Sequence, residues 1–139
     1  MKTIRVITAA LGFLVLAGCG DSGPKTYPVS GKVALAGGDV QKLVGHSVEA
    51  ALDGDTNVRA TGIIGPDGTF TLETLQDGKI KKGAREGTYR VRIFPADEDE
   101  NGKKLRKPPI AARHFKFETS GLSFQVPANG EVTLEVSSR

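Results

Sequence analysis

The sequence has few of the side chains on which catalytic and metal sites usually depend. It contains one cysteine, no tryptophan, two tyrosines and two histidines. His46 and His114 show no His-x-His or His-Glu-x-x-His spacing for zinc, and no Gly-x-Ser-x-Gly nucleophile motif is present. Each histidine stands at the edge of an expected strand, where we predict a solvated or capping role. These absences argue against an enzyme, and the few aromatic rings argue against a sugar-binding platform.

Amphipathic helices are missing too, because no segment beyond the first twenty residues repeats apolar side chains with helical spacing over three turns. Apolar and polar residues instead alternate one by one along the chain, most regularly over Glu131 to Ser137. There Val132, Leu134 and Val136 are expected to point inward. The expected strands cover residues 27–35, 47–52, 58–64, 69–72, 88–94, 114–118, 121–126 and 131–137. The fold class is therefore all-β, and we predict a single antiparallel β-sandwich of seven to eight strands.

Turn signals separate these strands. Gly65-Pro66-Asp67-Gly68 has the residues of a tight turn, and Asn129-Gly130 predicts a two-residue hairpin. Between strands, Gln76 to Glu86 is polar and rich in lysine, so we expect a long surface connection. Pro95 to Pro109 is highly charged and is expected to form an exposed loop.

Three short motifs carry a resemblance to a known domain. Gly31-Lys32-Val33, Asp67 to Leu72 and Gly87 to Val91 resemble the carboxypeptidase regulatory-like domain, a small transthyretin-like β-sandwich. The resemblance implies a buried phenylalanine after the Asp-Gly turn and a Tyr89 with a buried ring and a hydroxyl bonded to nearby backbone. It implies no catalytic residue.

The N-terminal residues have the order of a secretory leader. Lys2 and Arg5 precede the apolar run Val6 to Leu16, which is shorter than the about 20 residues that span a bilayer. The run ends in Leu16-Ala17-Gly18-Cys19, which resembles the lipobox of bacterial lipoproteins. The resemblance implies cleavage before Cys19 and acylation of its thiol, which would leave no cysteine for a disulfide, a metal or catalysis.

With this leader, residues 1–18 form a signal peptide, 19–26 a lipid-anchored tether and 27–139 the β-sandwich domain. The whole chain is similar to small lipoproteins of planctomycete-type bacteria, which often carry a Ser-Gly-Leu strand and a final hairpin, as in Thr119 to Leu122 and Asn129-Gly130. The expected location is the cell envelope, on either the inner or the outer membrane.

Charge does not indicate a nucleic-acid partner. Of the 19 basic and 16 acidic side chains, Lys2 and Arg5 belong to the leader, so the mature chain is nearly neutral. Two basic stretches remain, one with Lys79, Lys81, Lys82 and Arg85 and the other with Lys103, Lys104, Arg106 and Lys107. If both lie at one end of the domain, they could bind an anionic polysaccharide or phospholipid head groups.

One acidic segment resembles half of a calcium loop. Asp97, Asp99 and Asn101 place oxygen ligands at alternate positions before a glycine, as in the first half of an EF-hand loop. Position twelve, where that loop needs glutamate, is Pro108. A weaker version is Asp53-x-Asp55-x-Asn57. The alternative is an acidic loop tip that only keeps the protein soluble.

From the sequence we expect a non-enzymatic, lipid-anchored β-sandwich that binds or scaffolds at the cell envelope without a cofactor. Its partners would be the membrane and an envelope protein or polysaccharide. The alternative function is a module that binds calcium or an anionic glycan.

Overall fold

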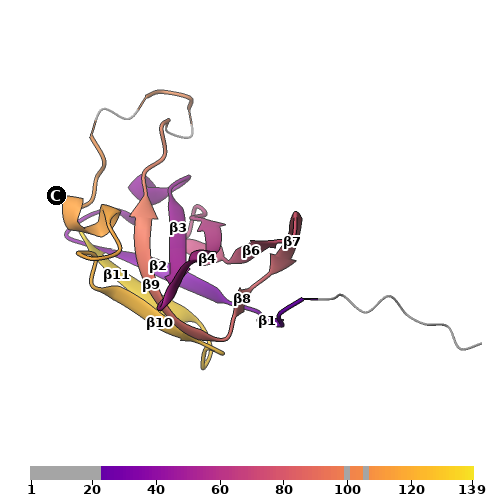
Figure 1. The fold of residues 1–139 in the computed structure, drawn as a ribbon. Coiled ribbons are helices and arrows are strands. Elements are labelled where there is room, and N and C mark those ends of the chain that lie inside the picture. Colours follow the sequence, from indigo (N-terminus) through magenta and orange to yellow (C-terminus); the bar gives the residue numbers. More distant parts are fainter. Residues whose placement is uncertain (1–22, 99–100, 105–106) are drawn as a thin grey trace, which may run out of the picture.

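The computed structural model describes residues 23–98, 101–104 and 107–139 (Figure 1). The predicted leader lies outside these residues. Within them the chain is all-β, with two short 3-10 helices, and the predicted fold class is confirmed at that level. The elements are β1 (Thr26–Tyr27), β2 (Ser30–Ala36), η1 (Val40–Leu43), β3 (Ser47–Leu52), β4 (Asp55–Ile63), β5 (Thr69–Thr71), β6 (Glu73–Gln76), β7 (Lys79–Lys82), β8 (Ala84–Arg85), β9 (Gly87–Phe94), η2 (Ala112–Phe115), β10 (Leu122–Val126) and β11 (Val132–Ser137).

The largest sheet has six strands in the order β10-β9-β3-β4-β6-β7, and every neighbouring pair is antiparallel. Strand β9, second from one edge, follows the predicted alternation, with Tyr89, Val91 and Ile93 buried and Arg90 exposed. Side chains of a strand point alternately to its two faces, so the first three line the inner face of the sheet.

A second sheet has three strands in the order β11-β2-β5. Val132, Leu134 and Val136 of β11 are buried as predicted. However, β11 does not form a hairpin with β10: it pairs in parallel with β2, so the predicted hairpin at Asn129-Gly130 is wrong. The segment between β10 and β11 instead crosses from the edge of the large sheet to the second sheet. Parallel pairing needs a long connection, and nearly the whole domain separates β2 from β11.

The tight turn Gly65 to Gly68 also passes the chain between sheets. The Gly68 N–H donates to the Gly65 carbonyl at 3.0 Å, and Gly68 has φ +81°, so the predicted turn is confirmed. It leads from β4 of the large sheet to β5, which pairs with β2.

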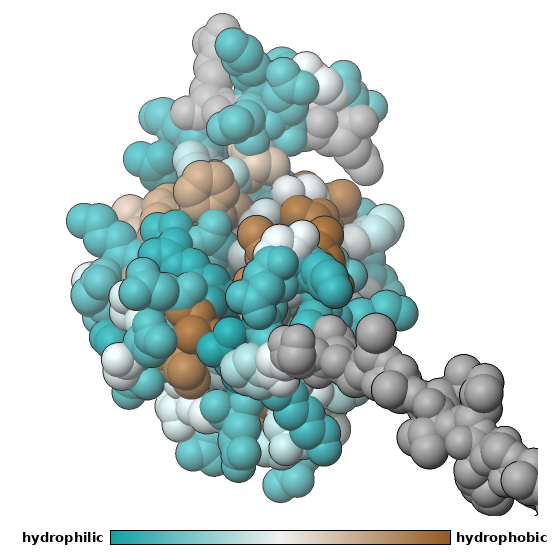
Figure 2. Space-filling view, turned by 45° about the vertical axis from the view of Figure 1, so that its right-hand side comes forward, coloured by the Kyte–Doolittle hydropathy of each residue, from teal (hydrophilic) through white to brown (hydrophobic). Residues whose placement is uncertain are grey.

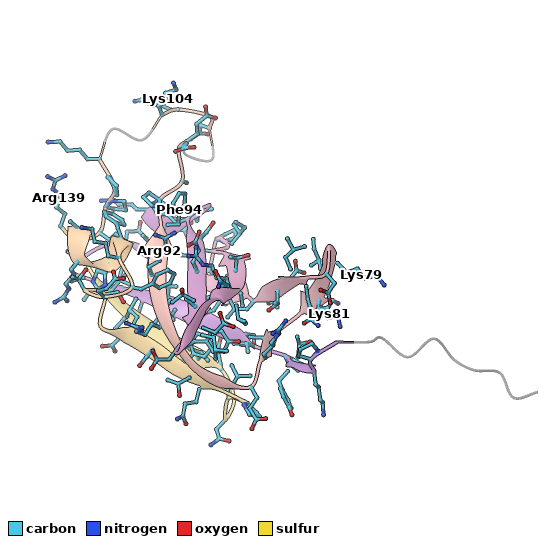
Figure 3. All side chains as sticks on the ribbon, viewed as in Figure 1. Lys79, Lys81, Arg92, Phe94, Lys104 and Arg139 are labelled. Carbon is cyan, nitrogen blue, oxygen red and sulfur yellow. The ribbon has the colours of Figure 1, made fainter. Side chains whose placement is uncertain are left out.

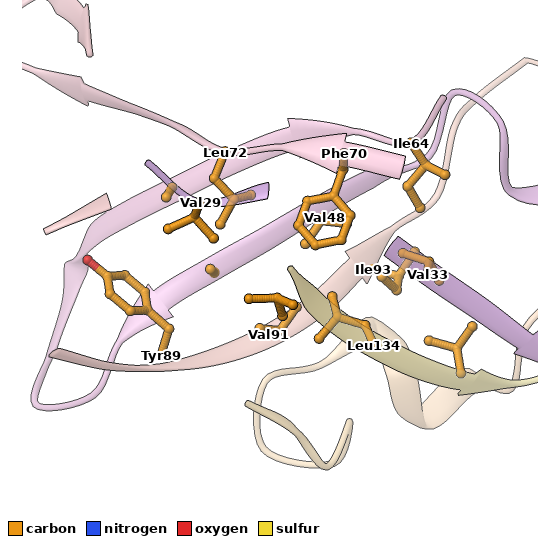
Figure 4. Close-up of a cluster of buried hydrophobic side chains, with 14 of the residues drawn as sticks. Val29, Val33, Val48, Ile64, Phe70, Leu72, Tyr89, Val91, Ile93 and Leu134 are labelled. Atoms are coloured by element: carbon orange, nitrogen blue, oxygen red, sulfur yellow. The ribbon is translucent and has the colours of Figure 1, made fainter. Parts of the chain in front are cut away.

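Both sheets contribute to one apolar core (Figure 4). Val48, Val91 and Ile93 come from the large sheet, and Val33 and Leu134 come from the smaller one. Each fully buried side chain of this kind contributes about 1.5–3 kcal/mol relative to leaving it in water. The core therefore holds the two sheets together.

The segment from Gln76 to Glu86 is not the predicted surface connection. It contains most of the β6–β7 hairpin, whose turn is Asp77-Gly78, and the short strand β8. Both turn residues have positive φ, 51° and 74°, as a two-residue hairpin turn requires. The sequence did not predict these strands because the buried side chains of β6, Thr74 and Gln76, are polar, whereas Leu75 and Ile80 are exposed.

The prediction of a strand over residues 114–118 is also wrong. The 3-10 helix η2 and a turn occupy this region. His114 is buried, and the ring of Phe117 lies on two guanidinium groups of the large sheet, 5.6 Å from that of Arg59 and 4.8 Å from that of Arg92. The segment therefore packs against the outer face of the sheet and adds no strand to it.

Candidate functional site

The residues of the predicted calcium loop lie between β9 and η2. Asp97 and Asn101 are exposed, whereas Asp99 lies outside the described residues. Glu98 forms an antiparallel bridge with Lys104, which closes the loop. In the part of the chain that the structure describes, no three histidine, cysteine, aspartate or glutamate side chains gather as a metal site would require. Calcium binding at Asp97, Asp99 and Asn101 stays a prediction.

The weaker acidic motif is engaged in local contacts. The Asp53 carboxylate lies 3.0 Å from the Arg90 guanidinium, and the Asp55 carboxylate accepts the Asn57 N–H at 3.2 Å. An arginine beside the first of these carboxylates opposes the binding of a cation there.

His46 is fully buried between η1 and β3, whereas we predicted it at a solvated strand edge. Neither ring nitrogen has a hydrogen-bond partner among the described residues. Burial lowers the pKa of the imidazole because a charged ring would lose its hydration. His46 is thus a core residue, not a solvated or capping one.

His114 is buried as well, and it contacts Ser137. Its Nε2 accepts the backbone N–H of Ser137 at 3.0 Å and lies 3.1 Å from the Ser137 hydroxyl. Burial, followed by the charge of Arg113, lowers its pKa. Since the Nε2 lone pair already accepts a backbone hydrogen, it is not free to deprotonate the serine. The pair fixes the C-terminal end of β11 against η2. His114 is therefore not solvated, but it accepts a backbone N–H at a strand end, as a capping residue does.

Tyr89 partly fulfils its predicted role. The ring is buried and stacks on Phe124, with ring centroids 5.5 Å apart. Its hydroxyl has no hydrogen-bond partner that meets normal geometry within the described chain, so the expected bond to backbone is not found. Burial raises the pKa of the phenol, an effect that the backbone and charge of Arg85 partly offset.

The start of the described chain packs against the β6–β7 hairpin. β1 pairs with β8 (Figure 1). A Cβ atom added at Gly23 would overlap the side-chain amide of Gln76. The Tyr27 backbone also crosses closely over Gly83, where a Cβ would lie 2.5 Å from the Tyr27 carbonyl carbon. Cys19 lies outside the described residues, only four positions before Gly23.

The two basic stretches do not lie together. In Figure 3, Lys79 and Lys81 project beside the N-terminal side of the domain, and Lys104 lies at the far end of the long loop. Arg106 is outside the described residues. The expectation that both stretches form one anion-binding end is therefore wrong.

A surface groove lies on the outer face of the large sheet, at the edge of the second sheet. It has a volume of about 580 Å³ and is lined by Ser47, Glu49, Thr61, Gly62, Ile63, Gly65, Thr69, Phe70, Thr71 and Glu73. Glu49 lies in register with Thr61, and Thr61 with Glu73, so the two carboxylates stand in one row across the sheet. The Glu49 carboxylate lies 2.6 Å from the Arg92 guanidinium, whereas the Glu73 side chain is exposed.

An apolar edge adjoins this groove. Ile63 is 62% exposed and Phe94 is 48% exposed, and both pair in register with Ser47. The groove thus combines a carboxylate with aliphatic and aromatic surface. The sequence alone does not reveal this groove, because most of its residues come from four different strands, β3, β4, β5 and β6. The only available signal was the pair of outward-facing apolar side chains, Ile63 and Phe94.

Among the described residues, no helix is long and apolar enough to cross a bilayer. Comparison of the chain with known protein families, curated proteins and solved structures returned no match.

Proposed function

We propose that this protein is a non-enzymatic bacterial lipoprotein, anchored to a membrane of the cell envelope through Cys19, whose β-domain binds or scaffolds a partner. The observation that carries the proposal is Leu16-Ala17-Gly18-Cys19 at the end of a short apolar run that follows two basic residues. The domain would be a β-sandwich of the transthyretin-like kind, since both sheets share one core and the Asp67-Gly68 turn precedes the buried Phe70.

The arrangement of the described chain supports an anchored domain. β1 begins at Thr26 and is paired with β8, so the domain starts a few residues after Cys19. A single acyl chain gives marginal membrane binding, but two or more give a stable anchor. A short connection to a structured domain would then keep the domain at the membrane surface.

The partner would bind in the groove on the outer face of the large sheet. Glu73 offers an exposed carboxylate, and Ile63 and Phe94 offer apolar surface beside it. Such a surface suits an envelope protein that presents a basic side chain next to an apolar one. We expect it to disfavour anionic polysaccharides, because the carboxylate of Glu73 would repel them.

Radiolabelled palmitate tests the anchor. Cells that express the wild-type chain should incorporate the label into this protein, and cells that express Cys19→Ser should not. Equal labelling of the two chains would refute the proposal.

Crosslinking in intact envelopes tests the binding surface. A photo-crosslinking residue at Ile63 should capture an envelope partner, and the same residue at Thr133, exposed on β11, should not. Identical crosslinks at both positions would exclude the groove.

A calcium titration distinguishes the anchored scaffold from the alternative function, a calcium-binding module. The anchored scaffold predicts no heat of binding and no change in melting temperature when calcium is added.

A further inference from the structure

The β6–β7 hairpin carries an exposed pair of aliphatic side chains. Leu75 and Ile80 are directly opposite each other in the register, and they are 72% and 71% exposed. Single exposed aliphatic residues are common on protein surfaces. Here two of them are adjacent on β6 and β7, the last two strands at one edge of the large sheet. Figure 2 shows small apolar patches on this side of the molecule, among hydrophilic side chains.

The hairpin is held firmly by its other face. Thr74 and Gln76 are buried, and the Thr74 hydroxyl donates to the Gly83 carbonyl at 2.7 Å. The exposure of Leu75 and Ile80 therefore belongs to a defined surface and does not follow from a loose loop.

Basic side chains lie on the strand that carries Ile80 and on a neighbouring segment. Lys79 and Lys82 are exposed on β7, and Lys25 lies on the neighbouring N-terminal segment, with its ammonium 4.9 Å from the centre of the Tyr27 ring. The hairpin from Glu73 to Lys82 contains three lysines and two acidic residues, so its net charge is positive. Aliphatic side chains flanked by lysines match the interface of an anionic bilayer, where apolar groups enter the head-group boundary and ammonium groups stay in water.

The position of the hairpin decides what would cover it. Gly23 contacts Gln76 on the hairpin, and four Cα-to-Cα steps limit the separation of Cys19 and Gly23 to about 15 Å. A lipid on Cys19 therefore brings this side of the domain to the bilayer. Lys104 and the C-terminal Arg139 lie on the other side (Figure 3).

We propose that the β6–β7 hairpin is a second contact with the membrane, in which Leu75 and Ile80 enter the interface and Lys79 and Lys82 bind anionic head groups. This inference rests on the proposed lipid anchor. The hairpin would orient the domain relative to the bilayer. Each lysine near an anionic surface strengthens binding by about fivefold at moderate salt.

The test uses the mature lipoprotein purified from membranes, in which acylation occupies Cys19. A cysteine introduced as Leu75→Cys is then the only thiol and takes an environment-sensitive fluorophore. Ile63→Cys on β4, where the native side chain is 62% exposed, is the control. Each labelled protein is added to preformed vesicles of phosphatidylcholine, alone or mixed with phosphatidylglycerol, and is treated with dithionite, which destroys fluorophores that are in water.

We expect the fluorophore at position 75 to emit at shorter wavelength than the one at position 63. It should also react with dithionite several-fold more slowly. The difference should be larger with phosphatidylglycerol and should shrink when salt is raised or when Lys79→Gln and Lys82→Gln are introduced. Ile80→Cys provides an independent label on the paired strand. Equal reaction rates at positions 75 and 63 would overturn the inference.

Flotation of the same vesicles separates this inference from the proposed anchor. If neither labelled protein floats, the anchor is wrong; if both float with equal reaction rates, only the hairpin contact is wrong. Protection at position 75 that disappears as protein is diluted on the vesicles would show that a second copy covers the hairpin, and would also overturn the inference.

Discussion

Replacing Gly83 with alanine tests whether the start of the domain is packed as the structure describes. Gly83 has φ +86°, and an added Cβ would overlap the Tyr27 carbonyl oxygen and lie 2.9 Å from the Pro28 nitrogen. These are backbone atoms, so the clash can be relieved only by moving β1. Gly54, with φ +88° and no atom within 4 Å of an added Cβ, is the matched control.

The left-handed backbone alone costs alanine about 1–2 kcal/mol, and both variants should show this loss. Gly83→Ala should also weaken the pairing of β1 with β8, which covers two residues on each strand. Each lost hydrogen bond costs about 0.5–1.5 kcal/mol. We therefore expect Gly83→Ala to lower the free energy of unfolding by about 2–5 kcal/mol and Gly54→Ala by about 1–2 kcal/mol.

Urea denaturation of the two variants and the wild type gives both values from the midpoints and slopes. Equal losses would refute the close approach of the Tyr27 backbone to Gly83. They would also remove the structural reason for placing the N-terminal chain against the hairpin.

Further predictions concern the core, the outer face of the sheet and pH. Leu134→Ala should destabilise the domain by about 2–5 kcal/mol in urea denaturation, because it leaves a cavity between the sheets, whereas Thr133→Ala on the exposed face should change stability by less than about 0.5 kcal/mol. Phe117→Leu should cost about 1–2 kcal/mol in the same assay, since it removes the ring that contacts two guanidinium groups; no loss would contradict this role. The pKa values of His46 and His114 are lowered by burial from 6.5, so below that pH the unfolded chain binds protons that the folded chain does not. Stability should therefore fall as pH drops below about 6.5, by up to about 1.4 kcal/mol per pH unit for each histidine, and urea midpoints that stay constant would contradict their burial.

Strands with one buried face were predictable from sequence. In β9 and β11 each inward side chain is apolar and each outward one is polar or exposed, so the alternation fixes the face of Val91 and Leu134. The pairing was not predictable in the same way. Asn129-Gly130 is a strong hairpin signal, but β11 pairs with β2, and its apolar side chains lie in the core that both sheets share.

The β6–β7 hairpin was missed for a different reason. Its buried side chains, Thr74 and Gln76, are polar and its exposed Leu75 and Ile80 are apolar, so the sequence showed no strand with an apolar inner face. Asp77-Gly78 was the usable signal, since this dipeptide favours the positive φ angles of a two-residue turn. The buried histidines were missed because their burial depends on tertiary packing. In His114, a ring nitrogen accepts a backbone hydrogen from Ser137, a residue distant in sequence.

The groove could not be deduced from any single segment. Glu49 and Glu73 lie on β3 and β6, with β4 between them, and only the register of the sheet places them in one row. The expected lipidation at Cys19, in contrast, depends on a local motif and needs no tertiary structure. This is why the sequence supports a proposal about location more directly than one about the partner.

The intact mass of the protein extracted from bacterial membranes tests the central proposal most directly. The account predicts a chain that begins at Cys19 and exceeds the mass of residues 19–139 by a glyceride and its acyl chains. A chain that begins at Met1, or one that begins at residue 19 with an unmodified thiol, would contradict it.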